Sequence, residues 1–217
     1  LIGGDYQYVM PLVNNRKYGI RYIYQPFFTQ QLGIFSELPV TSAIVLKFLD
    51  AIPVRFRLTD MNLNLGNSIQ SNLYSSRKNI TYHLNLSPAI TELRSGYNTN
   101  TRRNIQKAKH NNVSVMPFSD IRLFTEFTRS NLRKKSPEIK VRHYFALAEI
   151  LKYALYHNLG EIYVARNAEN KLLSAAFFLK TNQTCIYLAA SSNQEGIEKN
   201  EMFLLLDTFI ENNAESS

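Results

Sequence analysis

Residues 161–190 contain three apolar segments that are separated by very short polar turns. The segments are EIYVAR (161–166), LLSAAFFLK (172–180) and TCIYLAA (184–190), and the turns between them are NAENK and TNQ. Aromatic and β-branched residues in such runs favour strands. Because these turns are too short for a crossover connection, neighbouring strands are expected to run antiparallel. This part of the chain therefore predicts a three-stranded antiparallel meander.

Helical patterns lie on both sides of this meander. Ser87 and Pro88 form a helix start, because a serine can cap the first turn and proline fits its first position. Further helical patterns occur at 102–110, after Asp120, at 143–157 and at 201–211, and NNVSVMPF (111–118) is typical of a turn followed by a strand. From residue 111 the order is strand, helix, helix, three strands, loop and helix. This order predicts a mixed α/β domain of the α+β class.

The first third of the chain has a sheet-like pattern. Strands are predicted at 6–13, 20–25, 54–60 and 79–86, with the turn NNRKYG after the first strand and a helix over 41–52. The segment between these elements, PFFTQQLGIF (26–35), is apolar but irregular. We therefore expect a small sheet and one helix in this region.

The composition is that of a folded protein. The chain has 217 residues, of which 45% are hydrophobic, and its longest apolar run is interrupted by Lys47, Asp50 and Pro53. That run falls short of the ~20 residues that cross a bilayer. The single cysteine, Cys185, excludes an internal disulfide, and its apolar neighbours indicate a small buried residue rather than a nucleophile. The histidines have no metal-ligand spacing. We expect a cytoplasmic protein with no transmembrane segment and no metal site.

Positive charge is concentrated in one segment of the chain. The net charge is +8, and residues 98–142 hold eleven lysines and arginines against three acids, whereas the remaining residues are balanced. Such a field favours a polyanionic partner, for example a nucleotide, a nucleic acid or an anionic lipid head group. The alternative is a helical face that carries lysine and arginine for solubility. The sequence leaves both interpretations open.

Within that segment, Arg102, Arg103 and Lys107 are candidate phosphate ligands. Arg103 and Lys107 are four residues apart and share one side of a helix, whereas Ile105 and Ala108 face elsewhere, toward the core. Arginine can grip a phosphate with two parallel hydrogen bonds, and lysine adds a point charge. A structural role, in which these cations cap carbonyls or bridge to carboxylates, is equally open.

Two further groups of polar residues are candidate substrate contacts. The first group lies in an otherwise apolar segment and consists of Tyr24, Gln25, Gln30 and Gln31. Their amides and phenol could hold a peptide or carbonyl oxygen, although an ordinary surface loop is an equal alternative. The second group, Tyr187 and Ser191 or Ser192, lies at the end of the last predicted strand, where an aromatic core role is the alternative for Tyr187. No Ser-His-Asp or Cys-His arrangement can be argued from spacing, so no catalytic residue is assigned.

Three stretches of the sequence carry a family resemblance. They are YQPFFTQQLGIFS (24–36), YHLNLSPAITELRSGYNTNTRRNIQKAKHNNVSV (82–115) and CIYLAASSNQEGIEKNEMFLLLDTFIE (185–211), and the RRNIQKA run is their most distinctive part. Together they resemble the FemABX-like peptidyltransferases, which are related to acetyltransferase-type (GNAT) proteins. The resemblance implies a GNAT-like acyltransferase fold with two tandem GNAT-like domains, residues 1–86 and 87–217. Both domains are expected to be incomplete, and the second is expected to lack its C-terminal strands.

The resemblance also implies a function. The best-known members of the family transfer an aminoacyl group from aminoacyl-tRNA to the peptide of a cell-wall precursor. It therefore implies acyl or aminoacyl transfer to an amine, with aminoacyl-tRNA or acyl-CoA as the donor substrate and no bound cofactor. The expected partners are tRNA or a UDP- or lipid-linked precursor, with peripheral contact to an anionic membrane surface.

Two alternatives to this function are open. An acetyl-CoA-dependent N-acetyltransferase needs a Q/R-x-x-G-x-G/A loop whose amides cradle a pyrophosphate. The corresponding loop here, SSNQEGIEKN, has the single glycine Gly196, and its acids Glu195 and Glu198, with Glu201 just after it, would repel a pyrophosphate. The other alternative is a non-catalytic nucleic-acid-binding or scaffold protein, although most aromatic residues lie in apolar stretches rather than among the cations.

Overall fold

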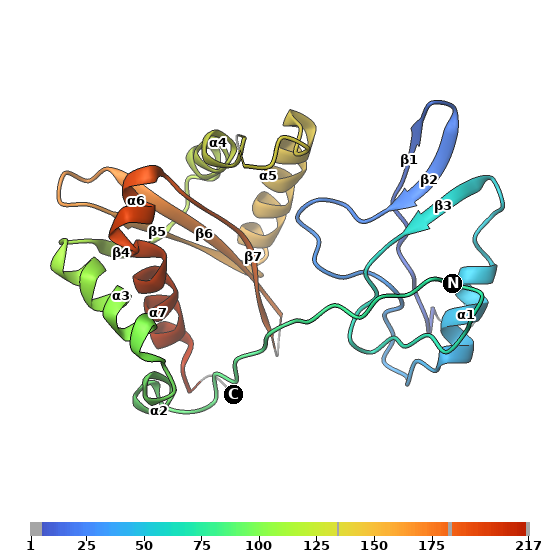
Figure 1. Cartoon of the computed structure of the whole chain (residues 1–217), viewed down its shortest axis with the longest axis horizontal. Helices are drawn as coiled ribbons and strands as arrows, with labels where there is room; N and C mark the ends of the chain where they lie inside the picture. Colours follow the sequence, from blue (N-terminus) through green and yellow to red (C-terminus); the bar gives the residue numbers. More distant parts are fainter. Residues whose placement is uncertain (1–5, 134, 182–183, 216–217) are drawn as a thin grey trace. The chain divides into compact units, whose positions relative to one another are not determined.

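Two units, Leu1–Thr81 and Tyr82–Ser217, make up the chain. The structure is a computed structural model that describes residues 6–133, 135–181 and 184–215 (Figure 1). Each unit has its own sheet and its own group of buried apolar side chains. Helices and strands are mixed along the chain, so the predicted α+β class is confirmed.

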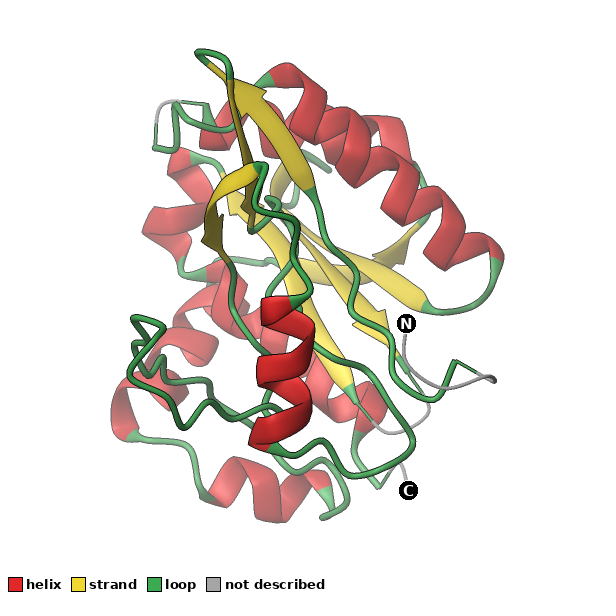
Figure 2. Ribbon diagram, turned by 90° about the vertical axis from the view of Figure 1, so that its right-hand side faces the viewer, coloured by secondary structure: helices red, strands yellow, loops and turns green. Residues whose placement is uncertain are grey.

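The first unit contains a three-stranded sheet and one helix, and most of its remaining chain is loop, drawn green in Figure 2. Its elements are β1 (Asn14–Lys17), β2 (Ile20–Tyr24), α1 (Ser42–Asp50) and β3 (Phe56–Asp60). β1 pairs antiparallel with β2, and β3 pairs parallel with β2, so the long connection through α1 acts as the crossover. The apolar side of α1 packs against Ile34 to form the core of this unit.

The hairpin of the first unit differs from the prediction. The residues NNRK form β1, and the chain reverses at Tyr18 and Gly19, whose φ angles are +50° and +81°. Two successive residues with positive φ match the twist of a tight hairpin, as in type I′ turns. The predicted strand at 6–13 is reduced to a bridge between Val9 and Phe35. The residues 79–86 form no strand, because an alternating pattern without a neighbouring strand has nothing to pair with.

The second unit is built on a four-stranded sheet in the order β4-β5-β6-β7, in which every neighbouring pair is antiparallel. The strands are β4 (Ser114–Phe118), β5 (Gly160–Arg166), β6 (Leu172–Lys180) and β7 (Cys185–Ser192). The meander that the short turns predict is therefore confirmed, and β4 adds a fourth strand beside β5.

Helices cover both faces of this sheet (Figure 1). The helices are α2 (Ile90–Ser95), α3 (Thr99–His110), α4 (Ile121–Leu132), α5 (Val141–Tyr156), α6 (Gln194–Lys199) and α7 (Glu201–Asn213). α3 and α7 lie on one face, here called the α7 face, and α4 and α5 lie on the other, here called the α4 face. The loop predicted at 191–200 instead contains α6, which Asn193 caps by accepting a hydrogen bond from the Gly196 N–H.

The core of the α7 face is built from aromatic and aliphatic side chains of sheet and helix. The rings of Phe178 in β6 and Phe209 in α7 stack with centroids 3.5 Å apart, and Tyr163 in β5 meets Phe209 edge-on at 5.6 Å. Ile105 and Ala108 of α3 are buried in the same core, as predicted. Their burial fixes which side of α3 faces solvent, and hence where its cations lie.

Candidate functional site

Helix α3 carries the three predicted phosphate ligands on its exposed side. The Nη2 of Arg102 donates to the carbonyl of Ser95 at 2.6 Å, and the Nζ of Lys107 donates to the carbonyl of Glu198 at 2.7 Å. These carbonyls lie in the last turns of α2 and α6, where the helix dipole favours a cation. Arg102 and Lys107 therefore tie α2 and α6 to α3, and their contact with a phosphate stays a prediction.

Arg103 has a more local contact. Its Nη2 donates to Asn100 Oδ1 at 2.7 Å, within the first turn of the same helix. This bond leaves the rest of the guanidinium on an exposed surface. Of the three predicted ligands, Arg103 is the one whose described contact reaches no other helix.

The glutamine-containing group lies in the first unit. The Nε2 of Gln25 donates to the carbonyl of Thr29 at 2.7 Å, and its Oε1 accepts from the N–H of Asn62 at 3.0 Å. Gln25 thus holds the loop after β2 in place. The other members are the half-buried Tyr24 and Gln31 and the exposed Gln30. The remaining five predicted site residues belong to the second unit, so the sequence groups residues from two separate units.

Strand β7 contains a β-bulge. Phe177 of β6 pairs with Ala189, and the next residue, Phe178, pairs with Tyr187, which leaves Leu188 as an extra residue. A bulge leaves backbone groups unpaired, and bulges are frequent beside active sites. Among the described strands, β7 pairs with β6 alone. The N–H and C=O groups on the other edge of β7 therefore have no partner strand among the described strands.

The bulge sends Tyr187 and Ser191 to opposite faces of the sheet. Residues four apart in a regular strand share a face, but one extra residue between them reverses the alternation. Ser191 is 5% exposed and lies on the α4 face, where its hydroxyl donates to Thr128 Oγ1 at 3.2 Å. Tyr187 lies on the α7 face with its ring 5.4 Å from that of Phe178. The structure therefore separates two residues that the sequence places together.

Tyr187 is partly exposed to solvent, and the pKa of its phenol is raised. Its side chain packs on Phe178, yet 46% of the residue is exposed, so a bound molecule can reach it. Desolvation, and after it the negative charge of Glu201, raise the pKa of Tyr187 to about 12. The phenol therefore keeps its proton at neutral pH and acts there as a hydrogen-bond donor.

A polar network lies on the α7 face beyond the bulge. Glu201, the first residue of α7, is 1% exposed, and its Oε1 accepts a hydrogen bond from the hydroxyl of Ser174 in β6. The hydroxyl of Ser174 is also 2.8 Å from that of Ser192 at the end of β7. The Oε2 of Glu201 has no hydrogen-bond partner among the described residues. A buried carboxylate with a free oxygen is costly unless a proton or a ligand completes it, so this network is a candidate functional group.

Gly196 in α6 closes over this network. A methyl group built on its Cα would be 2.5 Å from Glu201 Oε1 and 2.6 Å from the carbonyl oxygen of Leu173. No side chain fits at that distance, so glycine permits the close approach of α6 to the carboxylate. In the sequence, Gly196 and Glu201 are notable only because they belong to, or directly follow, a loop that lacks the pyrophosphate-binding signature. A single acid at the start of the apolar helix EMFLLLDTFIE was the signal that could have indicated Glu201.

The negative charge of Glu195, in the first turn of α6, is neutralised by lysines of the same protein. The carboxylate of Glu195 accepts hydrogen bonds from Lys171 at 2.6 Å, from Lys199 at 2.8 Å and from Asn167 at 3.0 Å. The bonds from Lys171, Lys199 and Asn167 lower the pKa of Glu195 to about 2. Because Glu195 and the lysines bonded to it occupy this position, the turn offers no free binding site for a pyrophosphate.

The shifted pKa of Glu195 gives a testable effect on stability. Its folded-state value lies below the ordinary 4.5, so its ionised form stabilises the fold above about pH 4.5, and this stabilisation is lost as the pH falls toward 2. We expect Glu195→Gln to unfold at lower urea concentration than the wild type at pH 6, and the difference to shrink as the pH falls toward 2. Urea titrations across this range measure it. Glu149→Gln, in the exposed pair with Lys152, is the control, and an unchanged pH dependence in Glu195→Gln would contradict the assignment.

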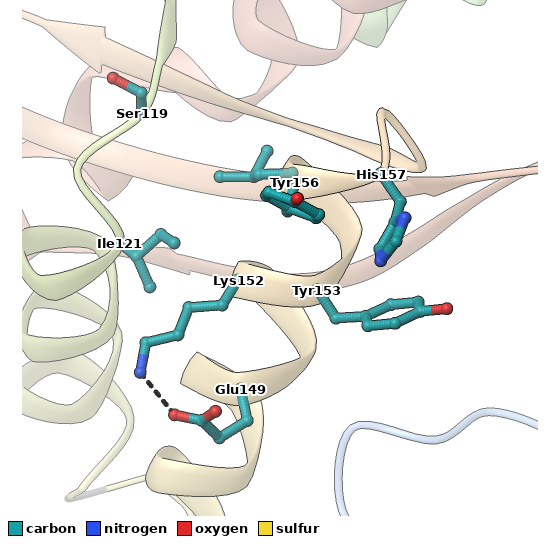
Figure 3. A pocket seen from close by; sticks show the side chains of 8 residues that line it. Ser119, Ile121, Glu149, Lys152, Tyr153, Tyr156 and His157 are labelled. Carbon is teal, nitrogen blue, oxygen red and sulfur yellow. Dashed lines mark hydrogen bonds and ion pairs between the residues drawn. The ribbon is translucent and has the colours of Figure 1, made fainter.

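A shallow depression lies at the C-terminal end of α5, on the outer side of the α4 face (Figure 3). It has a volume of about 710 Å³, and Lys152 and Glu149 form an ion pair of 2.6 Å on its wall. The ring of His157 is 4.3 Å from that of Tyr153 and 5.0 Å from that of Tyr156. These rings project from the helix into solvent, Tyr156 being 83% exposed. The depression is shallow, and its lining includes the Glu149–Lys152 ion pair and the ring of His157.

Neither Cys185 nor a cluster of metal-ligating residues marks a site in the described part of the chain. Cys185 is exposed at the start of β7, so the predicted buried position is wrong, because it pairs with Lys180 at the end of the β6–β7 ladder rather than in its buried middle. Desolvation of its sulfur still raises the pKa of the thiol, which disfavours the nucleophilic thiolate. No cluster of three His, Cys, Asp or Glu residues that could hold a metal occurs in the described part of the chain.

The fold and site together define a mixed α/β protein whose second unit carries a bulged strand beside a buried carboxylate. No protein-family model and no curated protein matches the sequence. Within the described residues, none of the helices is long and apolar enough to cross a membrane.

Proposed function

We propose that the protein transfers an acyl or aminoacyl group to an amine, as in FemABX-like and other GNAT-type acyltransferases. The observation that carries the proposal is the bulge of β7 beside the protonated, half-exposed Tyr187. The order of elements from β4 to α7 supports it, because it contains the strand, two helices, three strands and final helix that the sequence predicts from residue 111. Tandem GNAT-like domains are part of the same proposal.

The site has two kinds of hydrogen-bond donor that this reaction needs. Acyl transfer to an amine passes through a tetrahedral intermediate whose oxygen becomes negative, so donors must point at that oxygen. The phenol of Tyr187 is a donor at neutral pH, and the bulge and free edge of β7 can supply backbone N–H groups. The amine itself is the nucleophile, so the protein must only position it and accept a proton.

The charge distribution supports a polyanionic substrate. The excess of +8 lies within 98–142, and the described cations of α3 are on its exposed side. Aminoacyl-tRNA as donor, and a UDP- or lipid-linked cell-wall precursor as acceptor, are polyanions that such a field would attract. Arg103, Tyr24, Gln30 and Gln31 stay candidate substrate contacts within this proposal, as do Arg102 and Lys107 beyond their capping bonds. The proposal places the reaction in the cytoplasm, with contact to an anionic membrane surface when the acceptor is lipid-linked.

An assay with matched donors tests the proposal. The protein is incubated with aminoacyl-tRNA or acyl-CoA and a primary-amine muropeptide precursor, and mass spectrometry detects the new amide. We expect product with aminoacyl-tRNA, and we expect Tyr187→Phe to lower kcat about 100-fold, because it removes one donor to the oxyanion. Tyr153→Phe, which alters an exposed tyrosine of α5, is expected to retain full activity.

The arms of this assay separate the alternatives. Product from acyl-CoA alone would favour an N-acetyltransferase, and the neutralised turn at Glu195 argues against that outcome. Salt-dependent binding of tRNA without any product would favour a nucleic-acid-binding protein. A folded protein that yields no amide from any donor and acceptor pair would refute the proposed function.

A further inference from the structure

The hydrogen bonds around Glu201 have a fixed direction. Each serine hydroxyl has one proton to donate, and Ser174 donates its proton to Glu201 Oε1. The 2.8 Å contact between Ser174 and Ser192 must then be a bond in which Ser192 donates. The chain of donors therefore runs from Ser192 through Ser174 to the carboxylate, and the Ser192 oxygen keeps its lone pairs for another donor.

Solvent exposure differs along this series of hydrogen bonds, because only its outer member is partly exposed and its two inner members are buried. Ser192 is half-buried, Ser174 is 0% exposed and Glu201 is 1% exposed. The outer residue of the network is thus partly exposed, whereas the carboxylate lies inside the protein beneath Gly196. A carboxylate in such surroundings polarises the hydroxyls bonded to it more strongly than it would in water.

We propose that Ser192 binds the N–H of a primary-amine acceptor and that Ser174 relays its proton to Glu201. This inference rests on the proposed function, because it identifies where the amine of that reaction sits. Ser192 touches the acceptor and is the catalytic residue, while Ser174 and Glu201 are positioning residues that act through it. The site recognises a primary amine because that group can both donate to the Ser192 oxygen and attack an acyl carbon.

The proton and bond changes balance along the relay. The neutral amine, formed when its ammonium form releases one proton to water, attacks through nitrogen and forms a C–N bond with the acyl carbon of an activated ester, and the ester C–O bond breaks. The amine proton passes to the Ser192 oxygen, the Ser192 proton to the Ser174 oxygen, and the Ser174 proton to Glu201 Oε1. The departing oxygen takes a proton from water, and Glu201 later returns its own proton to solvent through the same hydroxyls.

The neighbouring Ser191 provides a matched control. It has the same side chain one residue earlier in β7, but it points to the α4 face and bonds Thr128. A substitution there changes the same strand without touching the relay. Valine and threonine have nearly the same shape, so Ser192→Val removes the hydroxyl whereas Ser192→Thr keeps it.

Binding of a simple amine tests the site without any acyl donor. The probe is ethylammonium chloride, compared with tetramethylammonium chloride, which has the same charge but no N–H, and the amide resonances of Ser192 and Asn193 are followed by NMR. We expect ethylammonium alone to shift them in the wild type, in Ser192→Thr and in Ser191→Val. Ser192→Val and Glu201→Gln are expected to weaken binding about tenfold or more, because each removes part of a charge-assisted hydrogen bond. Thermal melts confirm that each variant is folded.

The outcomes distinguish this inference from the proposed function. Equal shifts with both cations, no shift in the wild type, or unchanged binding in Ser192→Val would overturn the relay. Amine binding that follows the expected pattern, together with no amide product from any donor, would support the amine site and refute the transfer. Where product is formed, kcat should fall in Ser192→Val and be restored in Ser192→Thr, which a purely structural role of the strand would not predict.

Discussion

Replacing Arg94 with alanine is expected to lower the free energy of unfolding by about 3 kcal/mol. The guanidinium of Arg94 in α2 binds both carboxylate oxygens of Asp207 in α7 at 2.9 and 2.8 Å, and it also contacts Glu211. Asp207 is 2% exposed, so the variant would leave a buried charge without its cation. The value is at the low end for a buried pair because about a third of the Arg94 side chain is exposed.

Urea unfolding of matched variants measures this effect. Arg122→Ala removes the exposed pair with Glu126, whose side chains are 87% and 55% exposed, and its cost is expected to stay below about 0.5 kcal/mol. Adding Asp207→Asn to Arg94→Ala should recover part of the loss, because the buried charge is then gone. Equal destabilisation by Arg94→Ala and Arg122→Ala would show that the α2–α7 contact does not depend on the buried ion pair.

Replacing Gly196 with alanine is expected to cost about 2–3 kcal/mol of unfolding free energy. The new methyl group would overlap Glu201 Oε1 and the main-chain carbonyl of Leu173. The Leu173 carbonyl belongs to β6 and cannot rotate away, so α6 or α7 must shift. Because the same shift would displace Glu201 from Ser174, ethylammonium binding should weaken together with stability.

Gly96→Ala is the control for this substitution. A methyl group at Gly96 has its nearest neighbour, the carbonyl of Leu93, at 3.4 Å, which is an ordinary contact. Gly96 has a helical φ of −74°, so alanine is expected to be neutral or slightly stabilising there. Similar unfolding curves for the two variants would contradict the close packing of α6 over Glu201.

Local patterns predicted most elements of the second unit. The strand β6, for instance, follows from a run of apolar residues between two polar turns, and the burial of Ile105 and Ala108 follows from their spacing in α3. These signals are local because strand alternation and helix periodicity depend on neighbours a few residues away. The first unit was predicted less well. Its β1 consists of NNRK, whose residues are typical of a turn. These residues form a strand because they pair with β2.

The candidate site was predicted only in part. The sequence predicts Tyr187 and Ser191 or Ser192 together at the end of the last strand, because nothing in CIYLAASS marks Leu188 as a bulge. The bulge arises from the register between β6 and β7, which depends on how both faces of the sheet pack. The sequence indicates Arg102 and Lys107 equally as phosphate ligands and as cations that cap carbonyls. Their described bonds are to carbonyls of other helices, and no local spacing reveals which helices these are.

The sequence by itself determined the order of helices and strands from residue 111, apart from α6, and the concentration of positive charge in 98–142. Both are properties of residues that are close along the chain. The tertiary structure alone decided that Ser174, Ser192 and Glu201 form one network, and that Arg94 pairs with Asp207 across 113 positions of sequence. The reason is physical: these polar groups acquire their partners and lose their water only when α7 packs onto the sheet, and that burial gives them their chemistry.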